Sequence, residues 1–168
     1  METLTKYLAV AAGGALGAVL RYYLGGTLLG RAAAPFPTAT FAINVSGSFA
    51  LGLFLTLATE RFNVSPHLRL AVAVGFVGAY TTFSTFEYET AKLVEDGDLT
   101  RAFLNVLLSV AAGLLAVWLG IFAARKVEGV PLRSAARYHR FELSADASDP
   151  HQSAGAEHDI RDSTIDPG

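Results

Sequence analysis

Four long apolar stretches constrain what this chain of 168 residues can fold into. They cover residues 7–30, 39–59, 70–94 and 102–124. Each reaches the roughly 20 residues that a helix needs to cross the hydrocarbon core of a bilayer. Joined by short connections, they leave a soluble domain without polar faces for water. The sequence therefore predicts an all-α integral membrane protein with four transmembrane helices surrounded by lipid, and Thr100 is expected to cap the fourth.

Charged residues are scarce and unevenly placed. They make up 17% of the chain, against about 25% in an average soluble domain. Residues 1–126 hold 9 Lys/Arg and 7 Asp/Glu, whereas residues 127–168 hold 4 and 8. This division predicts a four-span transmembrane domain over 1–126 and a polar, acidic, disordered tail over 127–168. The formal net charge of -2 disfavours nucleic acid as a partner, and the lack of Cys excludes disulfides and thiol nucleophiles.

Small and polar residues interrupt the third stretch. Gly75 and Gly78 are followed, between positions 81 and 86, by three Thr, one Ser and two Phe. Most of these are weaker helix formers than Ala or Leu, so we expect a broken third helix. Non-helical backbone at membrane depth is tolerated only where protein or a polar cavity satisfies it, and its free carbonyls can hold a cation. The alternative is a continuous helix whose hydroxyls bond back to their own carbonyls.

The second and fourth stretches carry polar side chains at helical spacing. In the second stretch, one helical face carries Thr40, Asn44 and Ser48. In the fourth stretch, one face carries Asn105, Ser109 and Gly113. Each stripe either holds helices together or lines a pathway. Asn44 is the stronger candidate for a ligand, because a primary amide in hydrocarbon is costly unless its donors and acceptor are engaged.

In the first stretch, Gly13 and Gly17 stand four residues apart, which predicts a face for close helix packing. Arg21 is the one charged residue of this stretch. An ionised side chain at this depth faces a wet cavity or a partner, unless it snorkels to the headgroups. No Asp or Glu lies in the first, second or fourth stretch, and no His lies in any of them. A buried serine nucleophile has no base, so we expect no enzyme. The available hydrogen-bond donors, aromatic ring edges and positive charge of Arg21 favour an anion as the ligand.

Three blocks of sequence resemble the CrcB/Fluc fluoride channels. They are Gly13-Gly14 with Gly17-Ala18 and Arg21-Tyr22, then Asn44-Val-Ser-Gly47-Ser48-Phe49, and Gly75-Phe-Val-Gly78 followed by Thr81-Thr82-Phe83-Ser84-Thr85-Phe86. The similarity extends from about residue 4 to residue 124. It implies a four-helix subunit that works as an antiparallel dimer with two pores in the plasma membrane of a prokaryote. Passive export through these pores would lower cytoplasmic fluoride and give fluoride resistance.

The resemblance also implies roles for individual residues. The fluoride pathway would contain Asn44, Phe83, Phe86, Ser84, Thr85 and Ser109, and we include Thr40 from the Asn44 face. Arg21 would match a vestibule arginine, and Glu89 a glutamate just beyond the phenylalanines. Asn105 stands where many relatives carry Tyr, and it keeps a hydrogen-bond donor in the pathway. Backbone carbonyls of Gly78 and Thr81 would hold a structural sodium ion at the dimer interface.

Two other functions stay open at this stage. A small four-span dimeric drug or cation exporter usually needs a membrane carboxylate in its first span, where this chain has Arg21. A non-transport membrane scaffold would use the polar stripes only as contacts between helices. Juxtamembrane Lys and Arg number five on the side of the termini and three on the other, a weak bias toward cytoplasmic termini. Homodimers and heterodimers with an oppositely oriented paralogue both fit.

Overall fold

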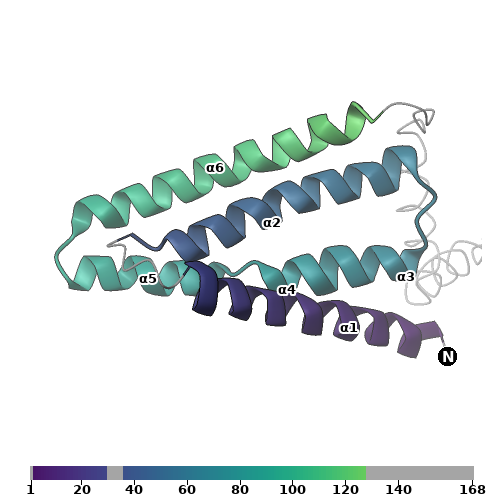
Figure 1. Ribbon diagram of the computed structural model, residues 1–168, viewed down its shortest axis with the longest axis horizontal. Coiled ribbons are helices and arrows are strands. Elements are labelled where there is room, and N and C mark those ends of the chain that lie inside the picture. Colours follow the sequence, from purple (N-terminus) through teal and green to yellow (C-terminus); the bar gives the residue numbers. More distant parts are fainter. Residues whose placement is uncertain (1, 30–35, 128–168) are drawn as a thin grey trace, which may run out of the picture. The chain divides into compact units, whose positions relative to one another are not determined.

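The computed structural model describes residues 2–29 and 36–127 of the chain. Within them, four helical segments are long and apolar enough to cross a membrane (Figure 1). They cover Glu2–Gly26, Thr38–Arg61, Pro66–Glu95 and Leu99–Arg125. This confirms the prediction of an all-helical protein with four candidate spans. The tail predicted over residues 127–168 lies, apart from Val127, outside the described residues.

Three of the four segments contain more than one helical element. The first is α1 (Glu2–Tyr23), continued by the π-helical η1 (Leu24–Leu29), and the second is α2 (Thr38–Thr56), continued by the π-helical η2 (Leu57–Arg61). The third contains α3 (Pro66–Arg69), the π-helical η3 (Leu70–Val77), α4 (Gly78–Tyr80) and α5 (Phe83–Glu95). The fourth is α6 (Leu99–Arg125).

The turn between α5 and α6 corrects one detail of the sequence analysis. Thr100 lies inside α6, and Asp98 is the capping residue, accepting a hydrogen bond from the Arg101 amide at 3.1 Å. A carboxylate at this position satisfies an amide that the helix leaves free and complements the helix dipole. Gly97 precedes it with φ 78°, a conformation that favours glycine. The predicted cap at Thr100 was therefore wrong by two positions.

Glycines bring the helices into close contact in two pairs. The first helix α1 packs on η3 and α4, and α2 packs on α6 (Figure 1). Gly13 and Gly17 are buried against η3, where a methyl group on either would collide with backbone atoms of Ala71 or Phe76. In the second pair, a methyl group on Gly52 would lie 2.5 Å from the Val117 carbonyl oxygen. These contacts confirm the predicted packing face of α1.

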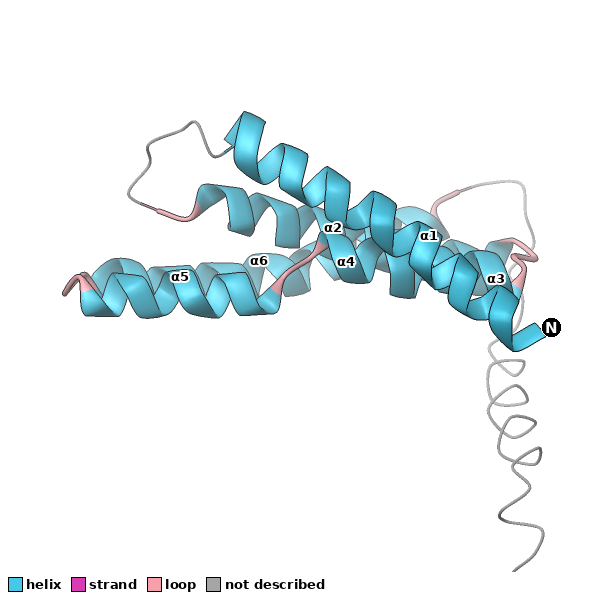
Figure 2. Cartoon of the chain, turned by 90° about the horizontal axis from the view of Figure 1, so that it is seen from below, coloured by secondary structure: helices cyan, strands magenta, loops and turns pink. Residues whose placement is uncertain are grey.

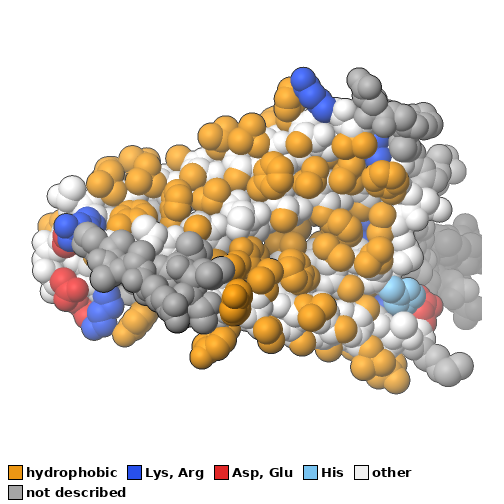
Figure 3. All heavy atoms as spheres, viewed as in Figure 1, with side chains coloured by type: hydrophobic (Ala, Val, Ile, Leu, Met, Phe, Trp, Pro, Cys, Tyr) orange, Lys and Arg blue, Asp and Glu red, His pale blue; other side chains and the backbone are white. Residues whose placement is uncertain are grey.

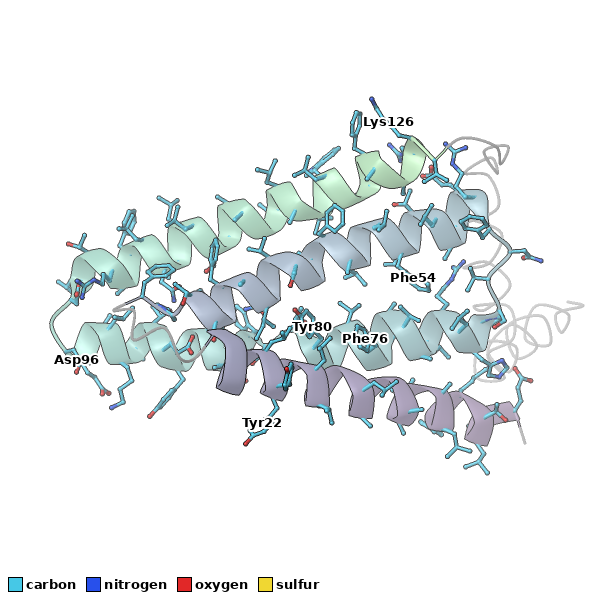
Figure 4. The ribbon with its side chains drawn as sticks, viewed as in Figure 1. Tyr22, Phe54, Phe76, Tyr80, Asp96 and Lys126 are labelled. Atoms are coloured by element: carbon cyan, nitrogen blue, oxygen red, sulfur yellow. The ribbon has the colours of Figure 1, made fainter. Side chains whose placement is uncertain are left out.

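On the face seen in Figure 3, the surface is largely apolar along the helices, and the charged side chains lie near their ends. Leu16 on α1 and Leu114 and Trp118 on α6 are each more than 60% exposed. Figure 4 places Asp96 and Lys126 at opposite ends of the four segments. A surface of this kind is stable against lipid tails, whereas in water it would associate.

Replacing Gly52 by Ala should separate α2 from α6, because the added methyl meets backbone that cannot turn aside. We expect a loss of about 1–3 kcal/mol in stability, the usual effect of overpacking. The matched control is Gly113→Ala on α6, whose methyl would approach only the Ser48 Oγ, at 3.7 Å. Thermal melting in detergent should show a lowered midpoint for Gly52→Ala alone, and equal midpoints would contradict the packing described.

Candidate functional site

The third segment changes its backbone conformation at two residues, which we call the interruption (residues 81–82). Thr81 has φ -78° and ψ 158°, and Thr82 has φ -148° and ψ 113°, so both are extended. The helix α4 ends just before them at Tyr80, and α5 begins just after them at Phe83 (Figure 2). The chain leaves the helical ladder here, so the backbone amide and carbonyl of Thr82 need other partners.

Asn44 on α2 supplies those partners for Thr82. Its Nδ2 donates to the Thr82 carbonyl oxygen at 3.0 Å, and the Thr82 amide donates to its Oδ1 at 2.8 Å. The side-chain amide thus forms two hydrogen bonds with the main chain of a single residue. Asn44, predicted as a fluoride ligand, therefore lies against the interruption.

Thr82 also starts α5. Its Oγ1 accepts a hydrogen bond from the Thr85 amide at 3.2 Å and donates one to the Thr85 hydroxyl at 2.8 Å. This is the arrangement of a helix N-cap, in which a side-chain oxygen satisfies an otherwise free amide. Thr81 stays with α4 instead, because its amide and its hydroxyl both donate to the Val77 carbonyl at 3.0 Å.

Gly47 lets α2 approach the interruption closely. A methyl group at this position would collide with the Thr81 side chain and lie 3.1 Å from the Tyr80 ring. Tyr80 is itself buried, stacks on Phe76 with ring centroids 6.1 Å apart, and shares a 2.8 Å hydrogen bond with Ser46 (Figure 4). The absence of a side chain at Gly47 therefore brings Asn44 within reach of Thr82.

These bonds redirect two amides from the helical ladder. In a continuous α-helix, the Thr82 amide would bond the Gly78 carbonyl, and the Thr85 amide would bond the Thr81 carbonyl. Here the first donates to Asn44 and the second to the Thr82 hydroxyl. The carbonyls of Gly78 and Thr81 thus lose their helical donors, and both belong to residues that are not fully buried in the single chain.

Arg21 on α1 contacts the same region from the other side. Its side chain is half-buried, and its Nε donates to the Ala79 carbonyl at 3.0 Å. The contact places a positive charge at the carbonyl end of α4, where the helix carries partial negative charge. Arg21 therefore bonds to the backbone beside the interruption. Its role as a vestibule arginine stays a prediction.

The two phenylalanines lie together on the first turn of α5. The ring centroids of Phe83 and Phe86 are 5.8 Å apart, with a tilt of 37° between the ring planes. Phe83 is 70% exposed and Ser84 is also exposed, whereas Phe86 is partly covered. In the single chain, the predicted aromatic pair is consequently exposed on the side of Phe83 and partly covered on the side of Phe86.

Further along α5, two pairs of polar residues link it to its neighbours. The buried Thr40 on α2 donates to the Glu89 Oε1 at 2.8 Å. Asn105 on α6 is 1% exposed, and its Nδ2 donates to the Thr90 Oγ1 at 2.8 Å. The hydroxyl of Ser109 lies 3.5 Å from the Asn105 Oδ1, at the limit for a hydrogen bond. The structure thus pairs Thr40 with Glu89 and Asn105 with Thr90.

Thr90 and the backbone of Thr82 were not predicted as the partners of the two asparagines. The available signal for Thr90 was its place four residues after Phe86, whose carbonyl its hydroxyl bonds at 2.8 Å. Among residues 2–29 and 36–127, His, Cys, Asp and Glu form no group of three that could hold a metal ion.

Four candidate spans, with an extended segment and paired polar side chains among them, define a small multi-pass membrane protein. Residues 8–121 match the family model described as CrcB-like protein, Camphor Resistance (CrcB). The chain belongs to this family, and it is a multi-pass protein of a prokaryotic plasma membrane. All the candidate site residues lie within the matched range.

Several bacterial proteins are similar to this chain over nearly their whole length. A fluoride-specific ion channel FluC of Solibacter usitatus is 50% identical over 121 residues, which are 72% of this chain and 99% of that protein. The protein of the same name from Acidobacterium capsulatum is 50% identical over 73% of this chain and 98% of its own length. That from Geobacter sulfurreducens is 48% identical over 74% of this chain and 100% of its own length.

Replacing Asn44 by Leu should destabilise the fold through the interruption. The change keeps the size of the side chain and leaves the Thr82 amide and carbonyl without their partners. Each unsatisfied buried group costs about 1–3 kcal/mol, so the melting midpoint in detergent should fall markedly. Ser48→Ala, one turn further along the same face, is the matched control. Equal midpoints for Asn44→Leu and the parent would show that the pairing contributes nothing.

Proposed function

We propose that this protein is a passive, fluoride-selective channel that lets fluoride leave the cytoplasm. The observation that carries the proposal is the identity of about half of the aligned residues with proteins named fluoride-specific ion channel FluC, over nearly their full length. An exporter of cations or a scaffold without transport activity has no such support. Export of fluoride lowers its cytoplasmic concentration and gives resistance to it.

The chemistry of the site suits this anion. Fluoride is small and strongly hydrated, so a pathway must replace its water with close hydrogen-bond donors. The tilted rings of Phe83 and Phe86 offer positively polarised edges, and the hydroxyls of Ser84 and Thr85 lie on the same helical turn. Modest neutral donors allow the ion to leave as well as to enter. The Asn44 amide keeps one N–H beyond its bond to Thr82, which can face a passing anion.

We further propose that a second copy of the chain, or an oppositely oriented paralogue, completes the pathway as an antiparallel dimer. Support comes from the outward-facing side of the site, where Phe83 is 70% exposed and Gly78 and Ser84 are also exposed. In lipid, such polar and small residues would meet hydrocarbon unless another protein surface covered them. A passive ion then moves with the membrane potential, at about 2.3 kcal/mol per charge per 100 mV.

The interruption is proposed as a break of the third transmembrane helix with a structural sodium ion beside it. The carbonyls of Gly78 and Thr81 have lost their helical donors, which makes them suitable ligands for a cation. Neutral carbonyls compensate a single charge better than a double one, so sodium fits better than calcium or magnesium. At the proposed dimer interface, two copies would contribute four such oxygens.

Purified protein in liposomes should release fluoride down its gradient and retain chloride. Chloride is larger and would meet the ring edges of Phe83 and Phe86 in a poorer geometry. Efflux measured with ion-selective electrodes gives both rates from the same preparation. Comparable chloride efflux would contradict the proposed selectivity, and the absence of any efflux would contradict the channel itself.

Phe83→Ile tests the aromatic edges. The change nearly conserves volume and hydrophobicity, so the fold should persist. We expect fluoride efflux to fall roughly five- to tenfold, since an aromatic electrostatic contact contributes on the order of 1 kcal/mol. Phe103→Ile on α6, whose ring is also exposed, is the control and should conduct normally. Unchanged efflux in well-folded Phe83→Ile would reduce the ring to packing.

The sodium proposal predicts that the melting midpoint is higher in sodium than in a large organic cation at equal ionic strength, because the ion binds only the folded state. Gly78→Val should abolish this difference. In the single chain a Cβ at this position meets no close neighbour, since the nearest atom is the Ala73 carbonyl oxygen at 3.9 Å. Thr81→Val keeps its carbonyl and should keep the difference. Equal melting of the parent in both cations would remove sodium from this account.

A further inference from the structure

We infer that Asn105 is a positioning residue to which fluoride does not bind directly. Through Thr90 it holds the aromatic turn of α5, which is the first turn with Phe83 and Phe86. The inference rests on the proposed channel function and concerns how this chain builds the pathway. It starts from the weak apolar anchoring of α5. None of the described side chains of α5 is buried in the single chain, whereas α2 and α6 each contain several buried residues.

In the described part of the chain, polar contacts with α2 and α6 therefore set the orientation of α5. At its start, the backbone of Thr82 is paired with Asn44. Further along, Glu89 bonds to α2 through Thr40, and the next residue, Thr90, bonds to α6 through Asn105. Two consecutive positions point about 100° apart on a helix. Bonds to two different neighbours at these positions restrict the rotation of α5 about its own axis.

The bond from Asn105 reaches the aromatic turn in two steps. Its Nδ2 donates to the Thr90 hydroxyl at 2.8 Å, and that hydroxyl donates to the Phe86 carbonyl at 2.8 Å. Because the hydroxyl proton of Thr90 is directed to Phe86, the group facing it from α6 must be a donor. This fixes the orientation of the Asn105 amide, with Nδ2 toward Thr90.

Burial separates a positioning role from a direct one. Asn105 is the largest side chain less than 2% exposed among the described residues. One N–H of its Nδ2 donates to Thr90, its Oδ1 faces the Ser109 hydroxyl at 3.5 Å, and burial keeps its second N–H from an anion at the exposed surface. Phe83 and Ser84, in contrast, are exposed on the side that the second subunit is proposed to cover. An anion would reach the exposed groups, while Asn105 acts on them through Thr90 and Phe86.

A double-mutant cycle with Asn105→Ala and Thr90→Val tests the inference, because residues that act through one bond are not additive. Each single variant should lower fluoride efflux from liposomes about tenfold, the effect of one lost buried hydrogen bond. Each should also lower the ratio of fluoride to chloride efflux. The double variant should be no worse than either single one. Thr90→Ser keeps the hydroxyl and should conduct nearly as the parent does, and Val106→Ala on the exposed side of α6 is the control.

Other outcomes would overturn the inference. Normal efflux from Thr90→Val beside a strong loss in Asn105→Ala would make Asn105 a direct ligand of the anion. A double variant with the product of the two losses would show independent roles. Lower melting midpoints with unchanged efflux and selectivity would reduce the bond to packing. A parent chain that carries no fluoride would instead contradict the proposed function, and the same cycle measured by melting would still report whether Asn105 and Thr90 are coupled.

Discussion

The pairing of the Asn44 side chain with the main chain of Thr82 is the interaction on which the rest of the site depends. It satisfies an amide and a carbonyl that leave the helical ladder in an apolar setting, where an unsatisfied group would destabilise the fold. By taking the Thr82 amide, it also frees the Gly78 carbonyl. One side chain on α2 thus accounts for the extended backbone and for one of the two carbonyls proposed to hold a cation.

Glycines and polar residues stabilise different parts of the structure. Gly13, Gly17 and Gly52 allow backbone to meet backbone, and dispersion holds those helices together. The aromatic helix α5 has no buried side chain in the single chain and is held by hydrogen bonds from α2 and α6. Apolar packing thus holds the helices α1, α2 and α6 in place, and a few hydrogen bonds orient α5, the helix proposed to contact the ion.

The sequence was sufficient to predict the four candidate spans and the packing face of α1, since both follow from local composition and spacing. It could not identify the partners of Asn44 and Asn105. An amide has several ways to be satisfied, and the choice depends on which backbone or side chain the folded chain brings near. Thr90 was overlooked for this reason, because its signal is a contact with α6 and not a motif. The cap at Asp98 was missed because Thr100 and Asp98 are both good capping residues.

Amide hydrogen exchange at Thr82 in the purified protein tests the central claim most directly, namely that Asn44 holds the interruption. In the parent, the Thr82 amide should exchange as slowly as its helical neighbours, although its backbone is extended, because Asn44 accepts its proton. In Asn44→Leu it should exchange much faster, while Ser48→Ala leaves it protected. Rapid exchange in the parent, or equally slow exchange in Asn44→Leu, would contradict the account.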